Sequence, residues 1–121
     1  MILVDTSIWI DHLHRSEPEL VRLLERNDVS VHPMVIGELA LGSLANRTQV
    51  LTLLGQLPHT RTATADEVLS LIESASLASS GLSLVDVHLL AAVRLTPECL
   101  LWTRDRRLLA AAGDHAWSTS T

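Results

Sequence analysis

Apolar residues occur along the chain in two kinds of run, and these predict alternating strands and helices. Short runs rich in apolar and β-branched residues, MILV (1–4), VSVH (29–32) and CLLWT (99–103), are typical of buried strands. Longer segments in which apolar residues recur every three or four positions are typical of amphipathic helices. Strands separated by helices indicate βαβ units, so we expect an α/β fold in which α-helices flank a parallel β-sheet.

Capping and breaking residues set the expected helix boundaries. Ser16, followed by Pro18 and Glu19, predicts the start of a helix. Gly42 and Pro97 predict the ends of two others. The expected helices are 6–14, 17–26, 33–42, 48–56, 65–79, 83–95 and 105–112, and weaker strand patterns lie at 59–64 and 116–118.

The composition favours one globular domain over residues 1–121. Apolar residues make up 47% of the chain and charged residues 19%, which argues against disorder. The single cysteine, Cys99, lies in an apolar run and is expected in the core, which fits a reducing compartment. Asp5 and Asp11 interrupt the apolar start, and no segment has the roughly 18 to 20 apolar residues that span a bilayer. We therefore expect a soluble, cytoplasmic protein.

Two acidic residues stand among apolar residues of expected helices. Asp86 falls on the apolar stripe of the helix at 83–95, and a carboxylate that faces the core needs a partner. That partner could be an arginine, a set of backbone donors or a metal ion. Glu38 lies in a helix with almost no other charge, where it is either solvated at the edge of the apolar arc or part of a site.

Two further acids, Asp5 and Asp105, lie just after expected strands. Asp5 directly follows the run at 1–4, and Asp105 comes two positions after the run at 99–103. Each is a competent cap for the helix that comes next. However, ligands of open parallel sheets bind outside the carboxyl ends of the strands, where both residues are expected to lie. Structural capping and a shared functional site both remain open for these two residues.

Taken together, the motifs VDTSIWI, GELALG, LVDVHLLAA and TRDRRLL resemble, in order and spacing, the four acidic motifs of PIN-domain ribonucleases. The resemblance is strongest to VapC toxins of bacterial toxin–antitoxin pairs and covers essentially the whole chain. It implies a single PIN-like domain with a cluster of acids that binds Mg²⁺ or Mn²⁺. The implied catalytic and metal-binding residues are Asp5, Glu38, Asp86 and Asp105, and the implied supporting hydroxyls are those of Thr6, Ser7 and Thr103.

Arginines surround the last of these motifs. Arg104, Arg106 and Arg107 could bind RNA phosphates or could form a solvated helix start. Many relatives carry another acid where Arg107 stands, so a second metal ion is expected to bind weakly or only with substrate. The net charge of −5 is unusual for a nucleic-acid-binding protein, but cations bound at an acidic site would offset much of it.

The family resemblance implies an endoribonuclease that hydrolyses RNA phosphodiester bonds by metal-activated water. It also implies a cognate antitoxin that neutralises the toxin, and either a homodimer or a toxin–antitoxin hetero-oligomer. The alternative is a noncatalytic α/β binding module whose acidic cluster is structural or binds an arginine of a partner. A P-loop NTPase is excluded, because the chain has neither a GxxxxGK[ST] loop nor any lysine.

Overall fold

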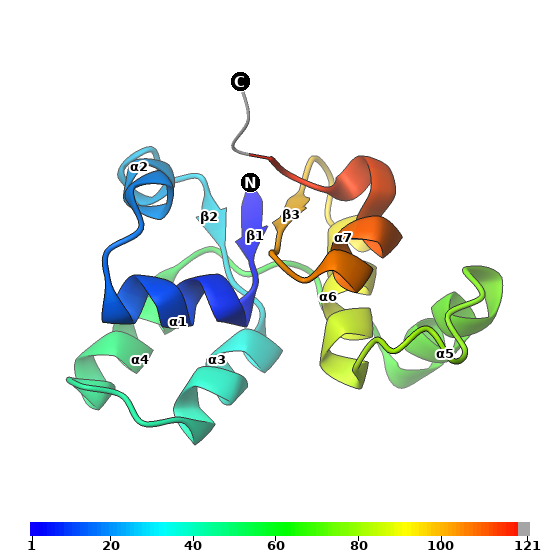
Figure 1. The fold of residues 1–121 in the computed structure, drawn as a ribbon, viewed down its shortest axis with the longest axis horizontal. Coiled ribbons are helices and arrows are strands. Elements are labelled where there is room, and N and C mark those ends of the chain that lie inside the picture. Colours follow the sequence, from blue (N-terminus) through cyan, green and yellow to red (C-terminus); the bar gives the residue numbers. More distant parts are fainter. Residues whose placement is uncertain (119–121) are drawn as a thin grey trace.

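Three short parallel strands form the centre of the protein. The computed structural model describes residues 1–118, and its sheet has the order β2-β1-β3, with β1 (Ile2–Val4) between β2 (Val29–Ser30) and β3 (Leu100–Trp102) (Figure 1). Ile2 pairs with Val29 on one side and with Leu100 on the other, in parallel in both cases. The expected parallel sheet flanked by helices is therefore confirmed.

The helices lie in two groups on either side of β1 (Figure 1). On the β2 side are α1 (Thr6–His14), α2 (Pro18–Glu25), α3 (Pro33–Leu41) and α4 (Arg47–Gln56). On the β3 side are α5 (Ala65–Ser74), α6 (Leu84–Leu95) and α7 (Arg106–Ala112), followed by the short 3-10 helix η1 (Gly113–His115). None of the helices in residues 1–118 is long and apolar enough to cross a membrane.

The core forms where the strands meet α6. Leu3 and Leu101 of the central strands are completely buried. Most residues of α6 from Val87 to Val93 are buried as well, because this helix packs against β3, α5 and α7 together. Trp9 is also buried, as are Trp102 and Cys99, which lie in the expected buried run at 99–103.

The prediction of an edge strand at 59–64 is wrong. Only His59 pairs with the sheet, through a single parallel bridge to Val31. Beyond it the backbone is drawn away, because the Arg61 amide donates to the side chain of Thr96 (3.0 Å). Thr64 then caps α5, and Glu67 completes a capping box with it.

Three other boundaries differ from their predictions. Ser16 does not cap α2; the capping position is Glu17, which makes no side-chain bond to its own helix. The helix expected at 65–79 ends at Ser74, because Ser76 and Ser79 adopt left-handed backbone conformations (φ 55° and 61°). The strand expected at 116–118 is reduced to one bridge between Ala116 and Leu101.

Candidate active site

A polar pocket lies where β1 and β3 end and the helices begin. Its volume is about 390 Å³, and it is lined by Asp5, Thr6, Ser7, Glu38, Asp86, Arg104 and Asp105. These residues come from α1 and its cap, α3, the first turn of α6 and the loop after β3. All four acids singled out in the sequence therefore line one pocket, and we call it the acidic pocket.

Asp5 is the buried member of the acidic pocket. It directly follows β1 and caps α1, and only 8% of its surface is exposed. Its Oδ1 accepts a hydrogen bond from the Thr6 amide (2.8 Å), and its Oδ2 accepts one from the Thr103 hydroxyl (2.7 Å). Burial raises the pKa of Asp5, with smaller contributions from the charges of Asp86 and Glu38, while the bonds from Thr103 and Thr6 act in the opposite direction.

Asp105 is fixed by α7 and by Thr103. Its Oδ1 accepts hydrogen bonds from the amides of Arg107 (2.9 Å) and Leu108 (3.1 Å), so it caps α7. Its own amide donates to the Thr103 hydroxyl oxygen (3.0 Å). Thr103 thus links Asp5 to the backbone of Asp105, and Asp105 is both a helix cap and a wall of the acidic pocket.

Glu38 is held by a hydroxyl on a different helix. It is exposed on α3, and its Oε1 accepts a hydrogen bond from the Thr6 hydroxyl (2.6 Å). Because the Thr6 amide also binds Asp5, this one threonine fixes two acids at once. Ser7 is exposed and lines the same pocket.

Asp86 does not face the core, contrary to its position on the apolar stripe. It lies in the first turn of α6, and its side chain is partly exposed. Its Oδ2 accepts a hydrogen bond from the Ser83 amide (3.0 Å), and its own amide donates to the Ser83 hydroxyl (3.1 Å). One backbone donor, the Ser83 amide, therefore bonds to this carboxylate, and its second oxygen has no hydrogen-bond partner among the described residues.

The three arginines differ in their surroundings. Arg104 lines the acidic pocket but bonds to Asp11 and Glu17, which are not among the predicted site residues. No local sequence pattern relates these residues, because they are 93 and 87 positions from Arg104. Arg106 and Arg107 are exposed and do not line the pocket, and the Arg107 guanidinium lies against the backbone of Gly81.

The chemistry of the acidic pocket suits a hard divalent cation. Its four carboxylates form no ion pair with any residue of 1–118, so their charge is uncompensated by arginine. Within the described residues, no three carboxylate, histidine or cysteine groups converge as a complete ligand set. Mg²⁺ commonly binds through one or two carboxylates and keeps several waters, so this donor set fits such an ion.

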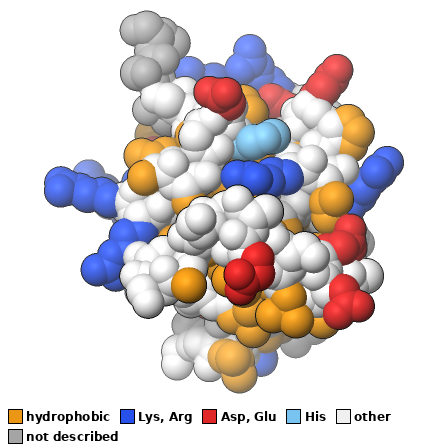
Figure 2. All heavy atoms as spheres, turned by 90° about the vertical axis from the view of Figure 1, so that its right-hand side faces the viewer, with side chains coloured by type: hydrophobic (Ala, Val, Ile, Leu, Met, Phe, Trp, Pro, Cys, Tyr) orange, Lys and Arg blue, Asp and Glu red, His pale blue; other side chains and the backbone are white. Residues whose placement is uncertain are grey.

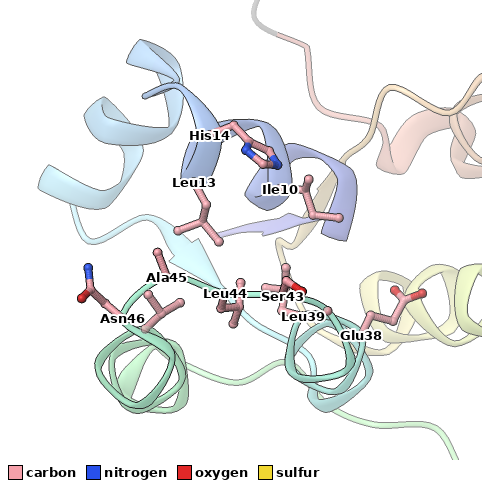
Figure 3. Close-up of a pocket in the computed structure, with 11 residues that line it drawn as sticks. Ile10, Leu13, His14, Glu38, Leu39, Ser43, Leu44, Ala45 and Asn46 are labelled. Atoms are coloured by element: carbon pink, nitrogen blue, oxygen red, sulfur yellow. The ribbon is translucent and has the colours of Figure 1, made fainter.

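An apolar groove adjoins the acidic pocket. Figure 3 shows side chains of α1 facing the segment that joins α3 to α4, with Glu38 at one end and Asn46 at the other. This cavity measures about 570 Å³, and Glu38 lines both it and the acidic pocket. We call it the α1–α4 groove; its apolar lining comprises Ile10, Leu13, Leu39, Leu44, Ala45 and Val50. Ile10 and Leu13 are more than 40% exposed there.

The side of the molecule that carries α5 to α7 has no single-sign charge field. Figure 2 shows basic side chains spread around this face, acidic ones between them, and apolar ones gathered in its lower part. A broad basic surface for a nucleic-acid backbone is therefore not present on this face. Contacts to phosphate would depend on individual arginines.

Comparison with known proteins identifies the class of protein that carries this site. The chain belongs to the PIN domain family, whose profile matches residues 2–114. It is 48% identical over 114 residues to Ribonuclease VapC32 of Mycobacterium tuberculosis, in both strain CDC 1551 / Oshkosh and strain ATCC 25618 / H37Rv. The match covers 94% of this chain and 92% of the relative. The resemblance to VapC-type PIN ribonucleases expected from the sequence is confirmed.

Proposed function

We propose that this protein is a metal-dependent endoribonuclease of the toxin type, which hydrolyses RNA phosphodiester bonds in the cytoplasm. Residues 1–121 would form one PIN domain. The observation that carries the proposal is that four carboxylates from separate segments line one pocket, and that none of them forms an ion pair with an arginine of residues 1–118. The similarity to a relative named as a ribonuclease supports the same reaction.

In this proposal Asp5, Glu38, Asp86 and Asp105 hold Mg²⁺ or Mn²⁺. Such an ion, when bound, supplies an activated water and offsets the charge of the phosphate under attack. The chain itself keeps the acids in place. The Thr103 hydroxyl orients Asp5 and favours its ionised form, and the Thr6 hydroxyl holds Glu38 beside it.

Arginine side chains would bind the RNA backbone next to the acids. Arg104 lines the acidic pocket, and Arg106 and Arg107 are exposed on the following helix. A guanidinium matches the geometry of a phosphate and stays charged at any physiological pH. On a chain with a net charge of −5, these few arginines would supply the local attraction that RNA needs.

The α1–α4 groove is the proposed contact for a cognate antitoxin. Its lining is apolar, and it runs into the acidic pocket at Glu38. An amphipathic antitoxin segment with a basic end would bury apolar side chains in the groove and reach the carboxylates. The proposed assembly is a homodimer or a toxin–antitoxin hetero-oligomer.

The test compares Asp86→Asn with Glu67→Gln in RNA cleavage by the purified protein with MnCl₂. The two acids occupy the same position in two capping boxes, on α6 and α5, but only Asp86 lines the acidic pocket. Asp86→Asn should lower cleavage at least about a hundredfold, the scale of losing one group that stabilises a transition state. Glu67→Gln should cleave at the rate of the unsubstituted protein.

The noncatalytic alternative predicts a different pair of results. A binding module would cleave no RNA and would gain no thermal stability from MnCl₂. The nuclease should gain stability, because an ion that binds only the folded state raises the free energy of unfolding, by about 2.7 kcal/mol at a hundred times its Kd. Full cleavage by Asp86→Asn, or no stabilisation by Mn²⁺, would contradict the proposal.

A further inference from the structure

Arg104 lines the acidic pocket, yet its guanidinium binds two carboxylates that do not line it, those of Asp11 and Glu17. We propose that Asp11 and Glu17 are positioning residues, which hold the Arg104 guanidinium at the rim of the pocket and keep it out of the metal site. This inference rests on the proposed function, because it concerns the same carboxylates.

Two short ion pairs hold the Arg104 side chain. Its Nη1 donates to Asp11 Oδ2 and its Nη2 to Glu17 Oε2, both at 2.6 Å. Asp11 lies on α1 and Glu17 at the start of α2, so the guanidinium joins the β3–α7 loop to two other elements. The guanidinium carbon also lies 5.8 Å from the centre of the Trp102 ring, within range of a cation–π contact.

Glu17 is placed for this contact and not for its own helix. It occupies the capping position of α2 but makes no side-chain bond to an amide there. Its amide donates to His12 Nδ1 (3.1 Å), which fixes the backbone beside the carboxylate. The carboxylate is only 23% exposed and is directed at Arg104. The Glu17 side chain therefore bonds to Arg104 instead of capping α2, which indicates that the Glu17–Arg104 pair has a role of its own.

The competing position for the guanidinium is the acidic pocket. Arg104 stands in the chain between Thr103, whose hydroxyl binds Asp5, and Asp105. It already lines the pocket that contains four carboxylates with no ion pair. Guanidinium binds carboxylates well, often through two parallel hydrogen bonds. Without its outer partners, Arg104 would therefore turn inward and compete with a divalent cation.

Holding Arg104 outward has two effects on the proposed reaction. The acidic pocket keeps its negative charge for the ion, and one guanidinium remains next to the pocket for a substrate phosphate. Asp11 and Glu17 then influence metal affinity without touching the metal. Because this effect on metal affinity depends on Arg104, substituting Arg104 should abolish it, which distinguishes it from a general loss of stability.

The experiment titrates MnCl₂ alone into purified protein by isothermal calorimetry. The test variant is Asp11→Asn/Glu17→Gln, which keeps side-chain size and removes both charges that hold Arg104. The control is Glu19→Gln/Glu25→Gln, which removes two charges from neighbouring positions on α2; Glu19 pairs with Arg22 and not with Arg104. The rescue variant adds Arg104→Gln to the test variant. Melting temperatures in EDTA verify that each variant is folded.

The test variant should bind Mn²⁺ at least about fivefold more weakly than the control, the scale of an ordinary coupling between neighbouring groups. Adding Arg104→Gln should restore the affinity. Equal affinity in test and control variants, or a loss that Arg104→Gln does not restore, would overturn the inference. If the unsubstituted protein bound no Mn²⁺, the proposed function itself would fail, and the inference with it.

Discussion

The hydroxyl of Thr103 is the most informative single group to remove. It donates to the buried Asp5 carboxylate at 2.7 Å and accepts from the Asp105 amide at 3.0 Å. Thr103→Val keeps the shape and removes both bonds. A hydrogen bond to a charged group contributes about 1.5 to 3 kcal/mol, and the orphaned amide adds to the loss. We expect the free energy of unfolding at pH 7 to fall by about 3 kcal/mol.

The size of this loss should depend on pH in a direction fixed by Asp5. Burial holds the folded pKa of Asp5 above its ordinary value of 3.8, and the Thr103 bond opposes that shift. Removing the bond raises the folded pKa further, so the folded state retains its proton to higher pH than the unfolded state. The resulting penalty is absent well below pH 3.8 and grows as pH rises through the folded pKa. The deficit should therefore be smaller at pH 4 than at pH 7, because a larger share of Asp5 is then protonated in the folded state and the bond lost to it is a neutral one.

Urea denaturation in EDTA at pH 7 and pH 4 measures both quantities. Thr103→Ser is the matched control, because it keeps the hydroxyl and loses only a methyl group, a change of about 1 kcal/mol. Its deficit should be the same at both pH values. The reasoning fails if Thr103→Val is as stable as Thr103→Ser at pH 7, or if its deficit does not change with pH.

Two further predictions concern other parts of the fold. The pKa of His32 is lowered to about 4 by burial, with smaller effects of His88 and His59, so its neutral form is favoured in the folded state. The contribution of neutral His32 to stability should be complete above pH 6.5 and should fall as pH drops toward 4. The free energy of unfolding, measured by urea denaturation, should be about 2 kcal/mol lower at pH 5 than at pH 8. His32→Asn should reduce this dependence of the free energy of unfolding on pH. Gly81 has a φ of +85°, so Gly81→Ala should lower the free energy of unfolding by about 1 to 2 kcal/mol. Its Cβ would also approach the Arg107 guanidinium, but that side chain can move, and adding Arg107→Ala should not restore stability; a fully stable Gly81→Ala would refute the backbone explanation.

The main elements were predictable because each has a strong local signal. Short runs rich in apolar and β-branched residues identified all three strands, and the capping residue Asp105 marked the start of α7. Asp5 and Asp105 could be assigned to one edge of the sheet because parallel strands end together. The four acids of the family motifs also line one pocket, although no three of them form a complete metal-ligand group within residues 1–118.

The failures arise where tertiary contacts override local pattern. The alternating residues at 59–64 do not form a strand, since the Arg61 amide bonds to Thr96 on a distant helix end. Helical periodicity placed Asp86 on the apolar stripe, but it lies in the first turn of α6, where it is partly exposed and bonds to Ser83. The pairing of Arg104 with Asp11 and Glu17 joins residues too far apart for any sequence period to relate them.

Asp5, Asp86 and Asp105 each stand at the amino-terminal end of a helix. The partial positive charge of a helix dipole is concentrated there, and it favours a carboxylate at low ionic strength. The helix ends thus offset part of the repulsion among these acids. The domain should consequently stay folded in the presence of a chelator, unlike a zinc finger, whose folding depends on its metal.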